Sequence, residues 1–193
     1  MVVHEGDIAD SLHLVESGRL AAQVSTPSGQ IATLNVIAAG EHFGEISLLD
    51  HRRPRRTATI VALEPTDTLS ISRTAFGKLR EEHPAVLHLV TVALAESVDR
   101  LSRRLLETMY DGLDHRVYRQ LLLLAEVYAD PPSSNEATIP LTQEVLAEFV
   151  GGARPSVNMA LIKLRDQGLV ALGRGKVTVL DRRALAARLR KAH

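Results

Sequence analysis

Cysteine is absent from the 193-residue chain. Without thiolates the chain can form neither disulfides nor thiolate zinc sites nor iron–sulfur clusters, so any sensing chemistry has to be non-covalent or use other ligands. Long apolar runs are also missing, because no stretch approaches the ~20 residues of a membrane-spanning helix. The acidic start lacks the basic and apolar regions of a signal peptide. These absences predict a soluble, cytoplasmic protein with no membrane partner.

Catalytic motifs are missing as well. The sequence contains no Walker loop and no nucleophile, base and acid at catalytic spacing, which predicts that the protein is not an enzyme. Its eight histidines form no cluster at metal-ligand spacing, although His42 and His51 fall near a stretch of functional interest. We therefore predict no metal site and interpret the histidines as solvated or hydrogen-bonded.

An excess of charge of one sign is absent, because 23 basic and 23 acidic residues balance. The two ends of the chain nevertheless differ. Residues 1–50 contain seven acids and one arginine, a net charge of −6, whereas residues 151–193 contain ten basic residues and two acids, a net charge of +8. A basic C-terminal end on a neutral chain predicts a nucleic-acid partner.

The N-terminal part is predicted to be an antiparallel β domain. Its segments are short, rich in β-branched residues and separated by turn signals, and no helix is expected to interrupt them. The expected strands are residues 12–15, 19–25, 30–37, 58–63 and 68–72, followed by a short helix over 72–80. Together with the helices that follow, this gives an α+β fold class.

A long amphipathic helix is expected over residues 84–109, with charged residues opposite an apolar seam. The seam consists of Leu87, Val90, Leu94, Val98, Leu101 and Leu105. At about 1.5 Å per residue this helix is roughly 39 Å long, more than a small domain needs for its own core. The seam therefore predicts a homodimer, the alternative being a helix buried within its own monomer.

A polar break at residues 110–114 is typical of a hinge. Beyond it we expect a helix over 116–129, a loop over 130–135, two short helices around Gly151-Gly152 and a hairpin over 169–179. These elements predict a small three-helix domain with a hairpin wing.

The two short helices have the features of a helix-turn-helix. Thr142 can cap the first, Gly151 breaks it, and Pro155 stands in the first turn of the second. The outward positions of the second helix are Arg154, Ser156, Asn158, Met159 and Lys163, and the inward ones are Val157, Ala160, Leu161 and Leu164. The second helix of such a pair enters the major groove of double-stranded DNA, whereas the alternative is a plain helical hairpin.

The stretch from Phe43 to Thr57 contains residue types that suit the binding of a phosphate and a sugar. A glycine lets the backbone approach a phosphate, a carboxylate accepts hydrogen bonds from ribose hydroxyls, and an arginine followed by a hydroxyl can hold a phosphate diester. Gly44, Glu45, Arg56 and Thr57 occur in this order. The alternative is an ordinary loop between strands with solvated arginines.

The elements Phe43-Gly44-Glu45, Ile46, Leu48 and Arg56-Thr57-Ala58 resemble the phosphate-binding cassette of the CRP/FNR family of bacterial regulators. The resemblance begins upstream at residues 10–19 and continues nearly to the C-terminus. It implies a cyclic-nucleotide-binding β-roll, a dimerisation helix and a C-terminal winged helix-turn-helix. In that family the position of Glu45 binds the ribose 2′-hydroxyl, and the positions of Arg56 and Thr57 bind the cyclic phosphate.

Two departures from the family pattern concern the effector. The loop before Arg56 is one or two residues longer, with His51-Arg52-Arg53 inserted, so Arg55 can compete for the phosphate. The paired positions that contact adenine in the family fall on Leu101 and Ser102, of which Ser102 keeps a hydroxyl. The expected effector site is Gly44, Glu45, Ile46, Arg55, Arg56, Thr57 and Ser102. Its expected ligand is cyclic AMP or cyclic GMP, with an unused or differently liganded pocket as the alternative.

The resemblance also assigns roles in DNA binding. Arg154 falls where the family contacts guanine, and an arginine can bond O6 and N7 together. Met159 and Pro155 depart from residues common in relatives, which implies a different operator. Lys163, Arg174 and Lys176 are assigned to phosphates, which position the domain without reading sequence. The expected DNA-binding residues are Thr142, Arg154, Ser156, Asn158, Met159, Lys163, Arg174 and Lys176.

The expected domains are an N-terminally truncated effector domain over residues 1–83, a dimerisation helix over 84–110 and a winged helix-turn-helix over 111–193. Because family members begin with an additional helix and strand, a strand near residues 12–24 is expected to be an unpaired edge.

The sequence thus predicts a homodimeric transcription regulator that binds a palindromic operator, with RNA polymerase as a further candidate partner. Effector binding is expected to reposition the recognition helices through the hinge. Two alternatives stay open: a DNA-binding regulator that ignores cyclic nucleotides, and a nucleotide-binding module that acts on a partner protein.

Overall fold

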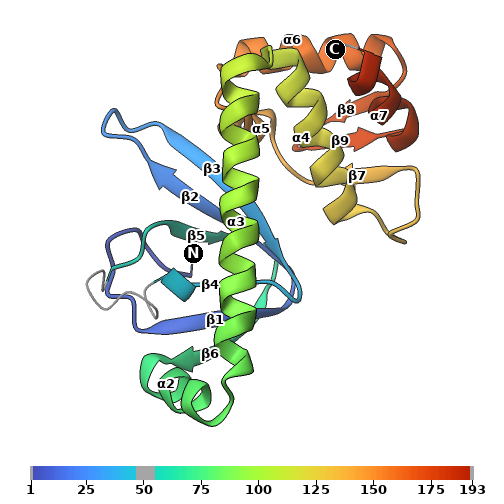
Figure 1. The fold of residues 1–193 in the computed structure, drawn as a ribbon. Helices are drawn as coiled ribbons and strands as arrows, with labels where there is room; N and C mark the ends of the chain where they lie inside the picture. The colour runs from blue at the N-terminus through green and yellow to red at the C-terminus, as the bar shows by residue number, and fades with distance from the viewer. Residues whose placement is uncertain (1, 47–54, 192–193) are drawn as a thin grey trace. The chain divides into compact units, whose positions relative to one another are not determined.

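The computed structural model describes residues 2–46 and 55–191 (Figure 1). The chain divides into two compact units, residues 1–102 and 103–193, and the division falls inside the long helix α3 (Ala85–Tyr110). The predicted α+β class is confirmed, with antiparallel sheets in the first unit and a helix-turn-helix in the second. None of the described helices is both long and apolar enough to cross a membrane.

The described strands of the first unit form two three-stranded antiparallel sheets, ordered β4-β1-β6 and β3-β2-β5 (Figure 1). They are β1 (Ser11–Ser17), β2 (Arg19–Ser25), β3 (Ile31–Ala38), β4 (His42–Phe43), β5 (Thr59–Ala62) and β6 (Asp67–Ser72). Val15 and Phe43 of the first sheet share one buried cluster with Leu20, Ile37 and Ile60 of the second. The core of this unit therefore lies where the two sheets meet.

The five expected strands exist, with small shifts at their ends, but two expectations about them are wrong. Glu45 and Ile46 are helical, so a helical segment does interrupt the strand run. The segment over residues 12–24 is not an unpaired edge, because β1 and β2 are the central strands of their sheets. β2 forms a local hairpin with β3, but the other partners lie far away in the sequence, as the pairing of Leu14 with Leu69 illustrates. Sequence patterns report neighbouring residues and do not reveal such pairing.

Two helices follow the strands. The side chain of Ser72 caps α2 (Arg73–Glu82) by accepting a hydrogen bond from the backbone N–H of Ala75. Phe76 of α2 and Val90 of α3 form a second buried cluster, against which Leu94 packs. The predicted long helix is confirmed, but part of its apolar seam already packs within its own unit.

The rest of the seam is exposed to solvent. Side chains of Val98 and Leu101 are 63% and 55% exposed, and Leu87 and Leu105 are exposed as well. Met109 extends the same row by one turn and is also exposed. A row of large apolar side chains at steps of three and four is typical of a helix–helix interface.

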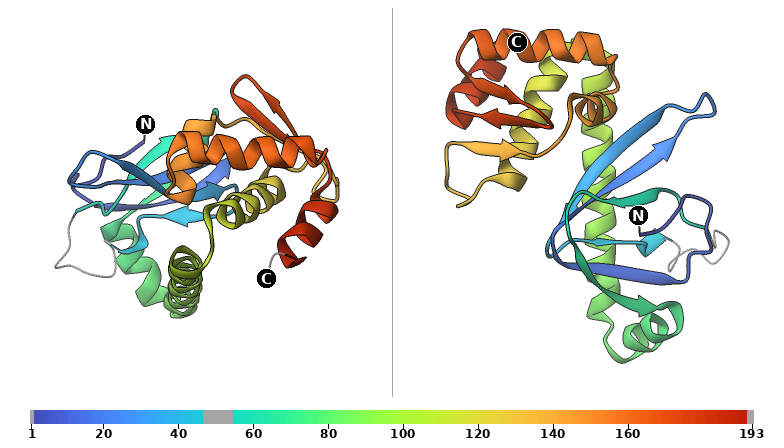
Figure 2. Two further views of the ribbon diagram at one scale, coloured as in Figure 1. Left: turned by 90° about the horizontal axis from the view of Figure 1, so that it is seen from above. Right: turned by 180° about the vertical axis from the view of Figure 1, so that it is seen from behind.

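The second unit consists of helices around a small sheet of order β7-β9-β8 (Figure 2). Its remaining elements are α4 (Leu113–Tyr128), β7 (Ala137–Ile139), α5 (Gln143–Val150), α6 (Arg154–Asp166), β8 (Val170–Gly173), β9 (Lys176–Val179) and α7 (Arg182–Lys191). Leu121 of α4, Leu161 and Leu164 of α6 and Leu185 of α7 are fully buried. Because α4 packs against both α6 and α7, these leucines belong to the interior of the unit.

The expected three-helix domain with a two-stranded wing is incomplete. β7 adds a third strand, and α7 adds a helix that packs against α4. Asp181 caps α7 by accepting a hydrogen bond from the N–H of Ala184 at 2.8 Å, and Asn135 donates to the same carboxylate. The two hydrogen bonds to Asp181 fix the start of this helix against the loop that precedes β7.

Candidate effector cavity and DNA-binding surface

The first unit contains a cavity of about 390 Å³, within the range of small-molecule sites. Its walls come from β3, β4, the segment around residues 55–60 and the middle of α3. The predicted effector residues that line it are Gly44, Glu45, Ile46, Arg55, Arg56 and Thr57. His42 lines the cavity too, whereas Leu48 and the inserted residues 51–53 lie outside the described residues.

Gly44 is required at its position for two reasons. Its φ of +94° lies in the region that favours glycine. A Cβ on Gly44 would overlap the Arg56 guanidinium and lie 2.7 Å from the carbonyl oxygen of Ser11. The order Phe43-Gly44-Glu45 thus lets the Arg56 guanidinium lie directly against the backbone.

Arg56 is the buried cation of the cavity wall. It is 7% exposed, and its guanidinium donates to the carbonyl oxygen of Ser11 at 2.8 Å and to Ser11 Oγ at 2.9 Å. Its Nε has no hydrogen-bond partner among the described residues. Burial lowers the pKa of Arg56, and the negative charges of Asp10, Asp7 and Glu45 oppose that shift. Arg56 is thus a desolvated cation with an unused donor.

Behind Arg56, a polar chain leads to His13. Ser11 Oγ lies 3.0 Å from a carboxylate oxygen of Asp10 and 3.1 Å from His13 Nε2. The His13 ring stacks on Phe43 with centroids 4.7 Å apart. Burial and then the charge of Arg56 lower the pKa of His13, whereas Asp10 raises it. His13 and Arg56 therefore contact the same Ser11 hydroxyl, and the lowered pKa favours the neutral imidazole.

The two candidate phosphate-binding arginines differ in placement. Arg55 is exposed and donates to the carbonyl oxygen of Gly6 at 2.7 Å. Arg56 is buried beside Gly44. Thr57 follows on the exposed side of the same segment, and Glu45 is half-buried. The cavity therefore brings together the residues of the predicted cassette that the structure describes.

Ser102 is not brought to this cavity. It is exposed on α3 and does not line the wall. The residues that α3 contributes instead are Ala93, Glu96, Ser97 and Arg100. Sequence reasoning missed them because it counted positions from the family pattern. Their helical spacing on the face beside the apolar seam was the available signal.

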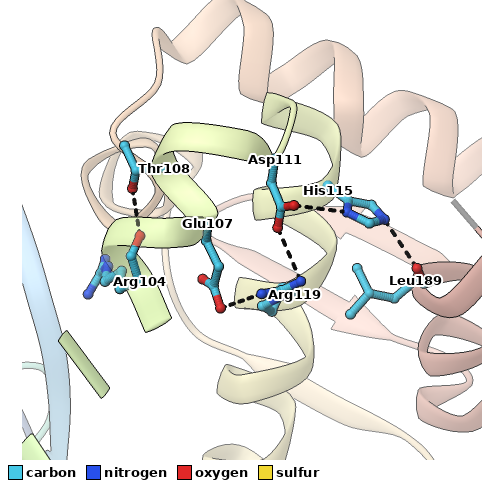
Figure 3. Close-up of polar contacts among 7 residues, drawn as sticks. All are labelled: Arg104, Glu107, Thr108, Asp111, His115, Arg119 and Leu189. Carbon is cyan, nitrogen blue, oxygen red and sulfur yellow. Dashed lines mark hydrogen bonds and ion pairs between the residues drawn. The ribbon is translucent and has the colours of Figure 1, made fainter. Parts of the chain in front are cut away.

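At the end of α3, ion pairs hold the break before α4 (Figure 3). Arg119 of α4 pairs with Glu107 and, at 3.1 Å, with Asp111. Asp111 also faces His115, whose Nε2 lies 3.1 Å from the carbonyl oxygen of Leu189 in α7. The predicted helix break is confirmed, and the chain at this break is tied by side chains of both flanking helices.

The structure contains the predicted helix-turn-helix, formed by α5 and α6. Thr142 caps α5 by accepting from the N–H of Val145, and Gly151 ends it in the left-handed conformation at φ +60°. The predicted inward positions of α6 are fully buried. Arg154, Ser156 and Met159 are exposed, and Asn158 is half-exposed.

A hollow of about 320 Å³ lies between the start of α5, Arg154 and the turn of the wing. Thr142 and Lys176 line it, and Arg174 is exposed in the same turn. Lys163 has another partner, because its Nζ lies 2.6 Å from a carboxylate oxygen of Asp114. This hydrogen bond raises the pKa of Lys163. Arg154 and Lys176 therefore share one surface, and Lys163 would have to leave Asp114 to contact a phosphate.

Residues 1–83 match the family model of the cyclic nucleotide-binding domain, and residues 115–188 match that of the Crp-like helix-turn-helix domain. The chain is 31% identical over 180 residues to the cyclic AMP receptor protein of Thermus thermophilus, covering 93% of this chain and 80% of that protein.

Two of the solved structures that are similar to this chain illustrate the shared fold. The first is a CRP-family transcriptional regulator of Thermus thermophilus, with 26% identity, a TM-score of 0.79 and coverage of 97% and 92% of the two chains. The second is the c-di-GMP responsive global regulator CLP of Xanthomonas campestris. It shares the fold at 22% identity with a TM-score of 0.78, covering 92% and 88%.

Proposed function

The chain belongs to the CRP/FNR family of transcription regulators, and we propose that it acts as a homodimer whose DNA affinity is controlled by a cyclic nucleotide bound in the cavity. The family consists of DNA-binding transcription regulators and not of enzymes. DNA binding and regulation of transcription are therefore the activity of this chain. The effector, the dimer and the roles of single residues are the proposed parts.

The effector proposal rests on one observation, which is that Arg56 is buried with one donor group unpaired among the described residues. A buried guanidinium is costly unless its donors are bonded and its charge is compensated. In Arg56 two donor groups bond Ser11, Nε has no partner among the described residues, and the side chain lines a cavity. An anionic oxygen entering the cavity would supply the missing acceptor and add to the negative charge that Asp10, Asp7 and Glu45 already place near Arg56. A cyclic phosphate is an anion of this kind.

The remaining cassette residues fit the sugar and phosphate of one ligand. Glu45 presents acceptors for the ribose 2′-hydroxyl, and Thr57 offers a hydroxyl next to Arg56 in the sequence. Gly44 keeps the backbone close to the phosphate. We assign the phosphate to Arg56 rather than Arg55, because Arg55 is exposed and gains less from an anion in high dielectric.

We propose the same division of labour for the domains as the sequence predicted. Residues 1–83 would hold the effector, residues 84–110 would dimerise, and residues 111–193 would bind DNA. The exposed row of Val98, Leu101 and Leu105 supports the dimer. A two-fold symmetric dimer fits a palindromic operator with one recognition helix, α6, in each half-site.

The test is calorimetry of the full chain with cyclic AMP and cyclic GMP, followed by a gel shift on promoter DNA with and without each ligand. We expect calorimetry to show binding of a cyclic nucleotide and the gel shift to change when that nucleotide is present. Arg56→Ala should weaken ligand binding by the ~1.5–3 kcal/mol of a charged hydrogen bond. Arg55→Ala is the matched control and should change the affinity much less. No heat at millimolar ligand would mean a DNA-binding regulator that ignores cyclic nucleotides.

A further inference from the structure

The wall of the cavity that α3 contributes carries charge. Glu96 and Arg100 are one helical turn apart and both line the cavity, with Ser97 between them. Arg100 donates through Nη2 to Ser97 Oγ at 2.7 Å, which orients its guanidinium. All three residues belong to the first unit, as does the rest of the cavity. This wall therefore offers a carboxylate and an oriented guanidinium to a ligand.

These two groups suit different edges of a purine. Guanine has two adjacent donors, N1–H and the N2 amino group, which match the two oxygens of a carboxylate. It also has two adjacent acceptors, O6 and N7, which an arginine can bond together. On adenine, a donor stands next to an acceptor at both edges. Either charged group then meets one mismatched atom and makes one hydrogen bond to the base instead of two.

The spacing along the helix fits a single base. Residues at i and i+4 on a helix have Cβ atoms about 5–6 Å apart. The donor pair and the acceptor pair of guanine follow one another around the ring perimeter, in the order N2, N1, O6, N7. Glu96 and Arg100 can therefore address both pairs of the same base, whereas Arg56 lies in the same cavity for the phosphate.

We propose that the cavity selects a guanine nucleotide, cyclic GMP, over cyclic AMP, with Glu96 and Arg100 as the residues that determine specificity. This inference rests on the proposed effector function of the cavity. A single cyclic nucleotide is the ligand of choice, because a cavity of about 390 Å³ lies near the lower end of the ~300–1,000 Å³ range of ligand sites.

The experiment measures affinities of the full chain for cyclic GMP, cyclic IMP and cyclic AMP by calorimetry. Cyclic IMP keeps O6, N7 and N1–H but lacks the N2 amino group. We expect affinity in the order cyclic GMP, cyclic IMP, cyclic AMP, with about tenfold or more between the first and the last, since a bidentate base contact discriminates by ~1–3 kcal/mol.

Two variants separate the roles of the side chains. Glu96→Gln should abolish the advantage of cyclic GMP over cyclic IMP, because an amide cannot accept from both guanine donors. Arg100→Ala should weaken cyclic GMP and cyclic IMP by similar factors, because both have O6 and N7, and should leave the advantage of cyclic GMP over cyclic IMP that depends on Glu96. Asp99→Asn removes the same charge from the same helix at a position that does not line the cavity, and it should leave the order unchanged.

The results distinguish failure of the guanine selection from failure of the proposed effector function. Tighter binding of cyclic AMP, or an unchanged order in both variants, would overturn the guanine selection and leave an effector-binding cavity in place. Binding of none of the three nucleotides would overturn the effector function together with the selection. Far-ultraviolet circular dichroism checks that each variant remains folded. We expect all three variants to fold, because the substituted positions are exposed on α3.

Discussion

The guanidinium of Arg104 in α3 donates a hydrogen bond to the backbone carbonyl oxygen of Phe149, which lies in the last turn of α5. The last four carbonyls of a helix have no partner within the helix. Arg104 thus supplies a donor to one of them, directly before the turn that leads into α6. Burial lowers the pKa of Arg104, and Glu107 opposes this shift.

Arg104→Ala should therefore destabilise the second unit. Loss of a hydrogen bond from a charged donor costs about 1.5–3 kcal/mol. Chemical denaturation followed by circular dichroism measures the loss of unfolding free energy. Arg174→Ala, at an exposed position in the turn of the wing, is the control and should change stability by about 0.5 kcal/mol or less. Equal effects of both substitutions would show that the contact with Phe149 contributes nothing measurable.

Gly44→Ala should damage both the stability of the first unit and its cavity. The new Cβ would be strained at φ +94° and would displace Arg56 from Ser11. Gly29→Ala is a matched control, because Gly29 has φ +80° but nothing within 4 Å of an added Cβ. The control should lose only the about 1–2 kcal/mol of backbone strain. Thermal unfolding of both variants gives the comparison, and equal losses would remove the argument for close approach.

The proposed dimer predicts a monomer after Val98→Asp combined with Leu101→Asp. Both side chains are more than half exposed, so the charges should break an interface without harming the fold. Leu94 is a poor choice for this test, because it packs against the cluster of Phe76 and Val90. Leu89→Asp, on the opposite face and 67% exposed, is the control. Light scattering decides, and an unchanged dimer mass in the double variant would place the interface elsewhere.

Base reading and phosphate anchoring should separate at Arg154 and Lys176. Arg154→Ala is expected to lose about 1–3 kcal/mol on the operator and little on random DNA. Lys176→Ala should weaken both and reduce the slope of log affinity against log salt by about one unit. Titration of labelled operator and scrambled duplex at several salt concentrations measures both quantities. Because Arg154 shares a hollow with Lys176, equal losses on both duplexes would make Arg154 a phosphate contact.

His13 should titrate below the ~6.5 of a free imidazole, because burial and Arg56 lower its pKa. Since the folded pKa lies below the unfolded one, the linked stability is present above pH ~6.5 and is lost as pH falls through the folded pKa. Nuclear magnetic resonance of the imidazole protons gives the value directly. Arg56→Ala removes one of the lowering causes and should raise the His13 pKa. A wild-type value at or above ~6.5 would contradict this account.

Local patterns in the sequence determined much of this protein. The step of three and four predicted α3, because a helix repeats every 3.6 residues regardless of its surroundings. Thr142 and Gly151 delimited α5, because capping depends on residues within one turn. The order of Gly44, Glu45, Arg56 and Thr57 predicted residues that line the cavity, because their chemistry and the family resemblance could be recognised without knowing the fold.

Tertiary structure decided what depends on distant residues. The difference in burial between Arg55 and Arg56, and the hydrogen bonds of Arg56 to Ser11, 45 residues away, appear only in the fold, and our proposal that Arg56 binds the phosphate rests on them. The pairing of β1 with β6 and of β2 with β5, and the docking of α7 on α4, likewise rest on long-range contacts. Glu96 and Arg100 line the cavity and Ser102 does not. This difference follows from which face of α3 is turned toward the cavity. Periodicity gives the faces of a helix, but only packing decides what each face meets.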